Sequence, residues 1–167
     1  MVAALAILLA AFITASCVLF VWPVTDKPQH VDAVLSLNGP GETARERLAI
    51  SLVEEGYSSV LLFSQGSYHN TPCPVLRGID VVCFVPSPAR TVGEVEFAAH
   101  YARQHGWHSL IVVSGHEQTT RARLLMSRCF AGRTLIVPAP LQLSQLPYGV
   151  IYEWGALLKA LTWDRGC

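Results

Sequence analysis

The hydrophobic positions of this chain form one long apolar run, followed by shorter runs with two different periodicities. Short β-branched runs predict strands at 32–37, 59–63, 79–84, 110–113 and 134–137. Amphipathic stretches predict helices at 42–55, 91–105, 118–129 and 148–161. Strands that alternate with helices of these lengths predict an α/β domain over residues 31–163, with a mainly parallel sheet covered on both faces.

The long apolar run lies at the N-terminus. Residues 1–25 carry no acidic or basic side chain, and residues 2–22 are almost wholly apolar. About 20 apolar residues suffice to cross a bilayer as a helix. Trp22 stands where aromatic interface anchors occur, and Pro23 ends the helix. We therefore predict a transmembrane anchor over residues 1–24.

Two alternatives to an uncleaved anchor are weaker. A signal peptide usually has an apolar region of roughly 7–15 residues behind a basic start, and this chain has neither feature. Residues 14–17 (TASC) match a lipoprotein cleavage site poorly, because the first position is not apolar. Hydrophobic residues make up 51% of the chain and charged residues only 14%, which also favours contact with lipid. The 12 basic side chains balance the 12 acidic ones without a basic patch, so no nucleic-acid partner is predicted.

The cysteines bear on the side of the membrane that the domain occupies. Cys17 lies in the apolar span, and the other four are Cys73, Cys83, Cys129 and Cys167. An even number in an exported domain suggests two disulfides, with three possible connectivities. A Cys73–Cys83 bond would close a proline-rich loop, and a Cys129–Cys167 bond would tie the chain end to a helix. Buried free thiols in a cytoplasmic domain are the alternative, but a proline-rich loop and a chain end are poor places to bury them. The flanking charges decide nothing, so the cysteines alone favour an extracytoplasmic domain.

Small or hydrogen-bonding residues follow four of the predicted strands. They are Asn38-Gly39, Ser64-Gln65-Gly66, Ser87 near Thr91, and Ser114-Gly115. Taken singly, each is ordinary turn chemistry. Ligands of open α/β sheets bind at the carboxyl ends of strands, so the recurrence predicts that these residues line one cleft.

Arg121 is the most informative charged candidate. It lies in the first turn of a predicted helix, where the helix dipole disfavours a cation unless an anion is bound there. Glu94 has capping-box spacing from Thr91, and Arg47 has the alternative of a solvated helix face. His69, His105 and His108 lack the acidic neighbours that would complete a metal site, so no metal is predicted.

Several motifs together resemble the YdcF/SanA/ElyC family: DAVLSLNG, EEGYSSVLLFSQG, PSPARTVGEVEFAAHYARQHGWHSLIVVS, TTRARLLMSRCF and YEWGALLKAL, over about residues 31–161. The resemblance implies a Rossmann-like three-layer sandwich behind one transmembrane helix, and a part in cell-envelope maintenance or in peptidoglycan and lipid-carrier metabolism. The family's Thr and Glu fall on Thr91 and Glu94, and its strand-end Ser/Thr and Arg-Ala fall on Ser114 and Arg121-Ala122. Position 118 is Gln where the family usually has His.

This departure favours binding over catalysis, because a glutamine amide exchanges no proton near neutral pH. We expect a protein that binds an anionic envelope precursor or related small ligand. The alternatives are an enzyme of phosphoryl or glycosyl chemistry on such precursors, and a cytoplasmic protein that binds a nucleotide or S-adenosylmethionine. The sequence identifies no cofactor. The candidate ligand-binding residues are Asn38, Gly39, Arg47, Ser64, Gln65, Gly66, Thr91, Glu94, Ser114, Gln118 and Arg121.

Overall fold

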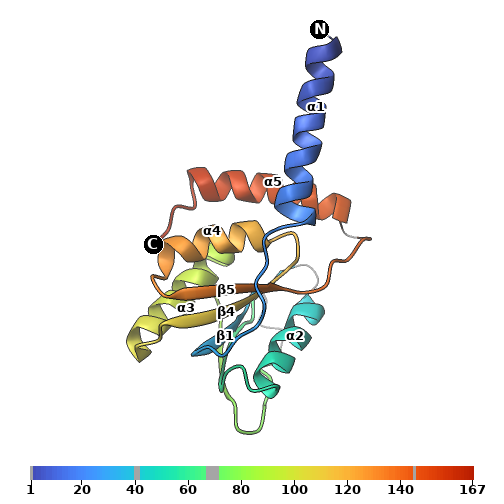
Figure 1. The fold of residues 1–167 in the computed structure, drawn as a ribbon. Helices are drawn as coiled ribbons and strands as arrows, with labels where there is room; N and C mark the ends of the chain where they lie inside the picture. Colours follow the sequence, from blue (N-terminus) through green and yellow to red (C-terminus); the bar gives the residue numbers. More distant parts are fainter. Residues whose placement is uncertain (1, 40–41, 67–71, 145) are drawn as a thin grey trace.

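The structure, a computed structural model, describes residues 2–39, 42–66, 72–144 and 146–167. An N-terminal helix stands apart from an α/β domain (Figure 1). The strands are β1 (Ala33–Ser36), β2 (Val60–Ser64), β3 (Asp80–Phe84), β4 (Ser109–Ser114) and β5 (Arg133–Pro138). The helices are α1 (Val2–Ser16), the π-helical segment η1 (Cys17–Val21), α2 (Glu42–Glu54), α3 (Thr91–His105), α4 (Thr119–Cys129) and α5 (Leu146–Thr162).

All five strands of the described sheet are parallel, in the order β3-β2-β1-β4-β5. Val34 of β1 is in register with Leu61 of β2 on one side and with Ile111 of β4 on the other. The chain order reverses between β1 and β4, which is the topological switch point where ligands bind in such sheets. The predicted parallel sheet is therefore confirmed.

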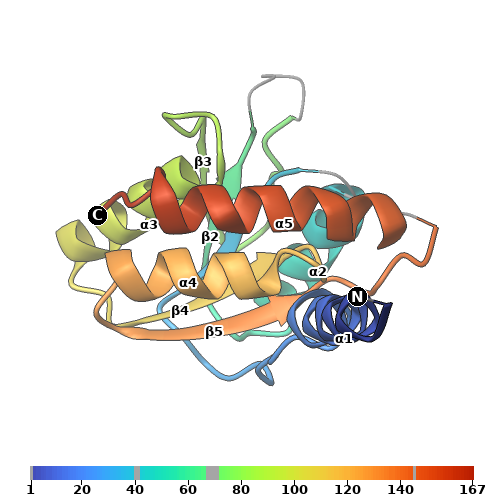
Figure 2. The same cartoon turned by 90° about the horizontal axis from the view of Figure 1, so that it is seen from above.

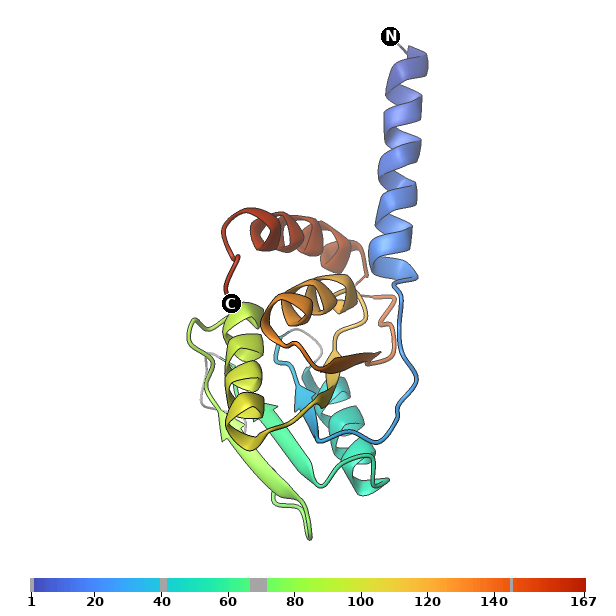
Figure 3. The ribbon, with the colours of Figure 1, turned by 60° about the vertical axis from the view of Figure 1, so that its left-hand side comes forward.

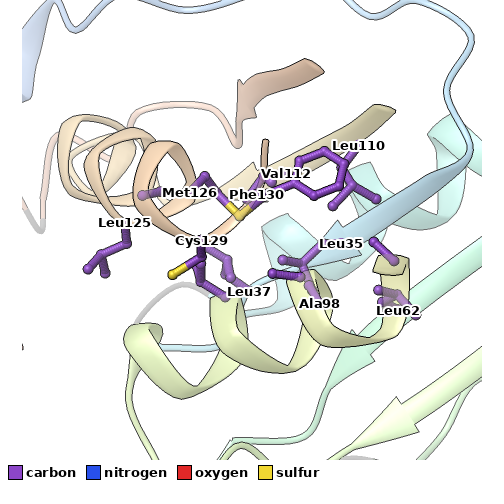
Figure 4. Packing of buried hydrophobic residues seen from close by; sticks show 14 of the residues in the cluster. Leu35, Leu37, Leu62, Ala98, Leu110, Val112, Leu125, Met126, Cys129 and Phe130 are labelled. Atoms are coloured by element: carbon purple, nitrogen blue, oxygen red, sulfur yellow. The ribbon is translucent and has the colours of Figure 1, made fainter. Parts of the chain in front are cut away.

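Alternating strand residues feed two hydrophobic cores, one on each face of the sheet. Val34 packs with Ala49 and Leu52 of α2, whereas the next residue, Leu35, packs with α3 and α4 on the opposite face. Figure 4 shows Leu35 among the side chains of this second core. Full burial of such a side chain stabilises the fold by roughly 1.5–3 kcal/mol, so a sheet covered on both faces is favoured.

Both predicted disulfides are present. Cys73–Cys83 links the loop between β2 and β3 to β3 itself. The residues of this loop that the structure describes form no helix. Cys129–Cys167 ties the chain end to the last residue of α4. By the chain-entropy estimate, closing loops of these lengths contributes about 3 and about 4 kcal/mol.

The segment between η1 and β1 covers the outer edge of β5. The Asp26 N–H donates to the Ile136 carbonyl at 2.9 Å, and the Ile136 N–H donates to Asp26 Oδ2 at 2.8 Å. Arg123 of α4 pairs with the same carboxylate at 2.7 Å. The edge strand is thereby protected from pairing with another chain, and the base of the N-terminal helix is fixed against the domain.

Helix α5 forms an additional layer outside α4. Figure 3 shows α4 between α5 and the sheet, with α2 on the far side. The sequence predicted this helix over 148–161, whereas it begins at Leu146 and has Pro147 as its second residue. Proline is tolerated in the first helical turn, where its missing N–H has no partner to lose. The three predicted layers are present, and α5 lies on top of them.

Candidate functional site

A cleft of about 580 Å³ lies at the carboxyl ends of the strands, between the N-terminal turn of α3 and helix α5. We call it the strand-end cleft. It is lined by seven of the eleven candidate residues: Asn38, Gly39, Gly66, Thr91, Glu94, Gln118 and Arg121. The structure thus brings most of the predicted strand-end residues together at one place.

The other four candidates do not line the cleft. Ser64 and Ser114 are buried at the ends of β2 and β4. The N–H of Gln65 donates to the Phe84 carbonyl beside them. Arg47 is exposed on α2 and donates from Nε to the Thr43 carbonyl at 3.2 Å, so it is placed away from the cleft. Its helical position, two residues off the buried stripe of α2, explains this placement.

Arg45, which the sequence analysis missed, occupies the place expected for Arg47. It is 1% exposed, and its Nη1 donates to Gln118 Oε1 at 2.8 Å. Its Nη2 donates to the carbonyl of Gly39. Helical spacing alone indicates that Arg45 is buried, because Arg45 lies on the same face of α2 as Ala49 and Leu52.

Gln118 joins the two turns at the switch point. Its Oε1 also accepts the Gly115 N–H at 3.1 Å, so one amide oxygen holds the turn after β4 and, through Arg45, the turn after β1. Gly39 has a φ of 131°, which favours glycine, and a Cβ there would lie 3.3 Å from Gln118 Nε2. The Gln118 amide oxygen therefore has a structural role. A primary amide also offers the cleft no group that takes up or releases a proton near neutral pH.

Glu94 lies on the first turn of α3 and is buried. Its Oε1 accepts the Asn38 N–H at 2.7 Å, which fixes the end of β1 to α3. Thr91 is not its capping partner, because Thr91 is itself the first helical residue and Arg90 is the N-cap. Burial raises the pKa of Glu94, although Ser64, the Asn38 N–H, Arg45 and Arg121 all act to lower it. Its carboxyl is therefore biased toward the neutral form.

Arg121 forms a bidentate ion pair with Glu153 of α5. Arg121 Nε and Nη2 donate to the two Glu153 oxygens at 2.8 and 2.7 Å, and Nη1 donates to the Thr91 hydroxyl at 2.7 Å. Burial alone would lower the pKa of Arg121, but Glu153 raises it above its usual value. The expectation that this cation awaits an anionic ligand is thus modified, because the protein supplies its counter-charge.

Glu153 is the second residue that the sequence analysis missed. It is the only acidic residue of α5, and it shares the buried stripe of that helix with Gly149 and Leu157. A single charge on the buried side of an apolar helix indicates a buried partner, and this signal was available in the sequence.

Two basic side chains and one further carboxylate also line the cleft. Arg90 pairs with Asp164 at 2.8 Å, and the exposed Lys159 lines the cleft from α5. Thr91 and Val92 bring the N-terminus of α3 to the cleft, and Arg90 makes no side-chain cap bond there. Helix N-terminal N–H groups and basic side chains are the groups that hold anions in proteins.

Within the described residues, no three His, Cys, Asp or Glu side chains gather as a metal site would require. Cys73 and Cys83 are joined to each other, and His69 lies outside the described residues. Chemically, the cleft offers hydrogen-bond donors, a buried carboxyl and an apolar wall from α5. Comparisons with protein-family models, with curated proteins and with solved structures found no match for this chain.

Proposed function

We propose that this chain is a membrane-anchored binding protein that holds a small anionic ligand in the strand-end cleft. The observation that carries the proposal is a cleft of about 580 Å³ at the switch point of the sheet, bordered by the N-terminus of α3. Small-molecule sites typically measure about 300–1,000 Å³ and favour such switch points.

The charges of the cleft support an anion rather than a cation. Among the described side chains in and beside it, Arg45, Arg90, Arg121 and Lys159 carry positive charge, against Glu94, Glu153 and Asp164. Among these carboxyls, that of Glu94 has its charged form disfavoured by burial, which raises its pKa. The positive end of the α3 dipole adds to this field.

Binding is favoured over catalysis because Gln118 stands where the resembled family has histidine. Its amide oxygen is engaged by Arg45 and by the Gly115 N–H. The rival function is an enzyme acting on a phosphorylated or sugar-linked precursor. One observation favours it: the cleft-lining carboxyl of Glu94 has a raised pKa, as a general acid requires.

The proposed location is a membrane, with the domain on the extracytoplasmic side. Val2–Val21 is a 20-residue helix apolar enough to span a bilayer, which supports a single-pass anchor. Two disulfides persist in oxidising compartments, which supports export of the domain. Nucleotides and S-adenosylmethionine are cytoplasmic ligands, so an envelope precursor is the better match, in agreement with the family resemblance.

Calorimetric titration of the full chain in lipid nanodiscs tests the proposal. The probes are inorganic phosphate, a sugar 1-phosphate and a polyprenyl phosphate. The charge reversal Lys159→Glu is expected to weaken binding, whereas Arg47→Glu, the same reversal on an exposed face away from the cleft, is expected to leave it unchanged. Equal affinities for both variants, or no binding of any probe, would overturn the proposal. Turnover of a probe that Glu94→Gln abolishes would establish the enzyme instead.

A further inference from the structure

Helix α5 presents an apolar face to the outside of the molecule. The residues at its i, i+3, i+7 spacing, Tyr148, Ile151, Gly155, Leu158 and Thr162, are all exposed and uncharged. Ile151 and Leu158 are 75% and 62% exposed, and Trp163 just beyond the helix is 84% exposed. An apolar stripe of this extent indicates an interaction surface.

The base of the N-terminal helix packs against α5. The Trp154 indole donates from Nε1 to the Ser16 hydroxyl at 2.9 Å. Its ring stacks on Phe12 at 5.3 Å and meets the edge of Phe20 at 5.4 Å. Phe20 and Ser16 are both buried. The level of α5 along the N-terminal helix is therefore fixed at Ser16.

Two views of the molecule show how α5 lies relative to α1. Figure 2 looks down on the domain with α1 pointing at the viewer, and α5 lies in front of the sheet, running alongside α4. Figure 1 shows the same helix lying flat at the foot of α1. Helix α5 thus lies on the side of the domain from which α1 projects.

We propose that α5 lies flat in the headgroup region of the bilayer that α1 and η1 span, with its outer stripe against lipid. This rests on the proposed membrane anchoring. The outer stripe of α5 lies on the side of the domain from which the apolar helix projects, so the bilayer that this helix spans would meet the stripe.

The charges of α5 agree with this placement. Glu153, its only acidic residue, is turned inward to Arg121, and Lys159 lies at the side that borders the cleft. The Trp154 indole meets Ser16, five residues before the last residue of the apolar helix, so α5 lies near the foot of that helix. Interfacial helices bury their apolar faces to roughly 5–10 Å.

This placement orients the strand-end cleft. Ile151 and Gly155 belong both to the outer stripe of α5 and to the lining of the cleft. With α5 in the headgroup region, the mouth of the cleft opens at the membrane surface rather than into bulk water.

Depth-dependent fluorescence quenching of the full chain tests the proposal. Cys17 is the only free cysteine, so a Cys17→Ala background allows single label sites beside the intact disulfides. The labelled variants are Leu158→Cys on α5, Ile7→Cys on α1 and Arg47→Cys on α2, three exposed positions where a dye disturbs no packing. Each is reconstituted in vesicles of phosphatidylethanolamine and phosphatidylglycerol, with and without brominated acyl chains.

The expected result is that the dyes at Leu158 and Ile7 lose most of their emission to brominated lipid, while the dye at Arg47 loses none. An unquenched dye at Ile7 would instead contradict the anchoring itself. Quenching at Ile7 without quenching at Leu158 would overturn the interfacial placement of α5 and leave the anchoring intact. Protection of Leu158 from both lipid and aqueous quenchers, increasing with protein density, would assign the stripe to a second copy and overturn the proposal as well.

Discussion

Arg121 and Glu153 form a buried bidentate ion pair that joins α4 to α5 beside the strand-end cleft. The two hydrogen bonds measure 2.8 and 2.7 Å, and the side chains are 8% and 1% exposed. Thr91 completes the arrangement by accepting from the third nitrogen of the guanidinium. The Arg121 guanidinium thus connects α4 to α5 and to the first residue of α3. Its ion pair with Glu153 links α5 to the cleft.

Replacement of Glu153 by Gln is expected to destabilise the domain by about 3–5 kcal/mol, because it leaves the Arg121 charge buried without its counter-charge. Urea unfolding followed by circular dichroism measures this loss. The double variant Arg121→Met, Glu153→Leu removes both charges and is expected to lose less than Glu153→Gln alone. A single variant as stable as the wild-type protein would contradict the inferred role of the pair.

Replacement of Gln118 by Ala is expected to cost about 1–3 kcal/mol, because it removes the acceptor of two buried donors, Arg45 Nη1 and the Gly115 N–H. The matched control is Gln104→Ala on the exposed side of α3, where a change below about 0.5 kcal/mol is expected. Equal effects of the two substitutions in urea unfolding would show that Gln118 does not join the turns.

Much of the fold was predictable because local signals and burial agree. The strands are short uninterrupted apolar runs, and the helix ends carry glycines with positive φ, at Gly56 and Gly106. The four cysteines outside the apolar span suggested two disulfides with three possible connectivities, and the structure has Cys73–Cys83 and Cys129–Cys167.

Site details were less predictable because they depend on partners distant in sequence. Arg45 meets Gln118, 73 residues away, and Arg121 meets Glu153, 32 residues away. Arg45 and Arg47 lie on the same helix, and the only sequence signal that separates them is that Arg45 shares a helical stripe with the apolar residues Ala49 and Leu52. The position of α5 outside α4 depends on packing with α1, for which no local pattern exists.

The raised pKa of Glu94 predicts that the free energy of unfolding depends on pH. Burial raises this pKa in the folded domain, so the stability associated with the neutral form is complete below the unfolded value of about 4.3 and is lost as the pH rises through the folded value. Glu94→Gln keeps an acceptor for the Asn38 N–H without the titration. Urea unfolding from acidic to neutral pH is expected to show a decline for the wild-type protein that this variant lacks. Parallel curves would contradict the raised pKa.

Asp32, at the other end of the sheet, predicts the opposite pH dependence of the free energy of unfolding. Burial alone would raise its pKa, but the Ser109 hydroxyl and the N–H groups of His108 and Ser109 outweigh burial and lower it. The associated stability is present above the unfolded value of about 3.9 and is lost as the pH falls through the folded value. Asp32→Asn is expected to flatten this acid limb in urea unfolding while ligand affinity stays unchanged, because Asp32 does not line the cleft. An acid limb as steep in the variant as in the wild-type protein would exclude this role.

The Cys129–Cys167 bond is expected to hold the C-terminal end of α5 over the cleft as well as to stabilise the domain. Cys167→Ser removes a cross-link worth about 4 kcal/mol in the chain-entropy estimate. Because the last turn of α5 contributes Lys159 and Ala160 to the cleft, the variant is expected to bind its anion more weakly as well as to unfold earlier. The control is Cys73→Ser with Cys83→Ser, which removes about 3 kcal/mol from a bond whose cysteines do not line the cleft. Thermal unfolding and calorimetric titration of both variants separate the two effects. If both variants lose the same affinity, α5 is not held by its disulfide; if only Cys167→Ser loses affinity, the bond positions the helix that closes the cleft.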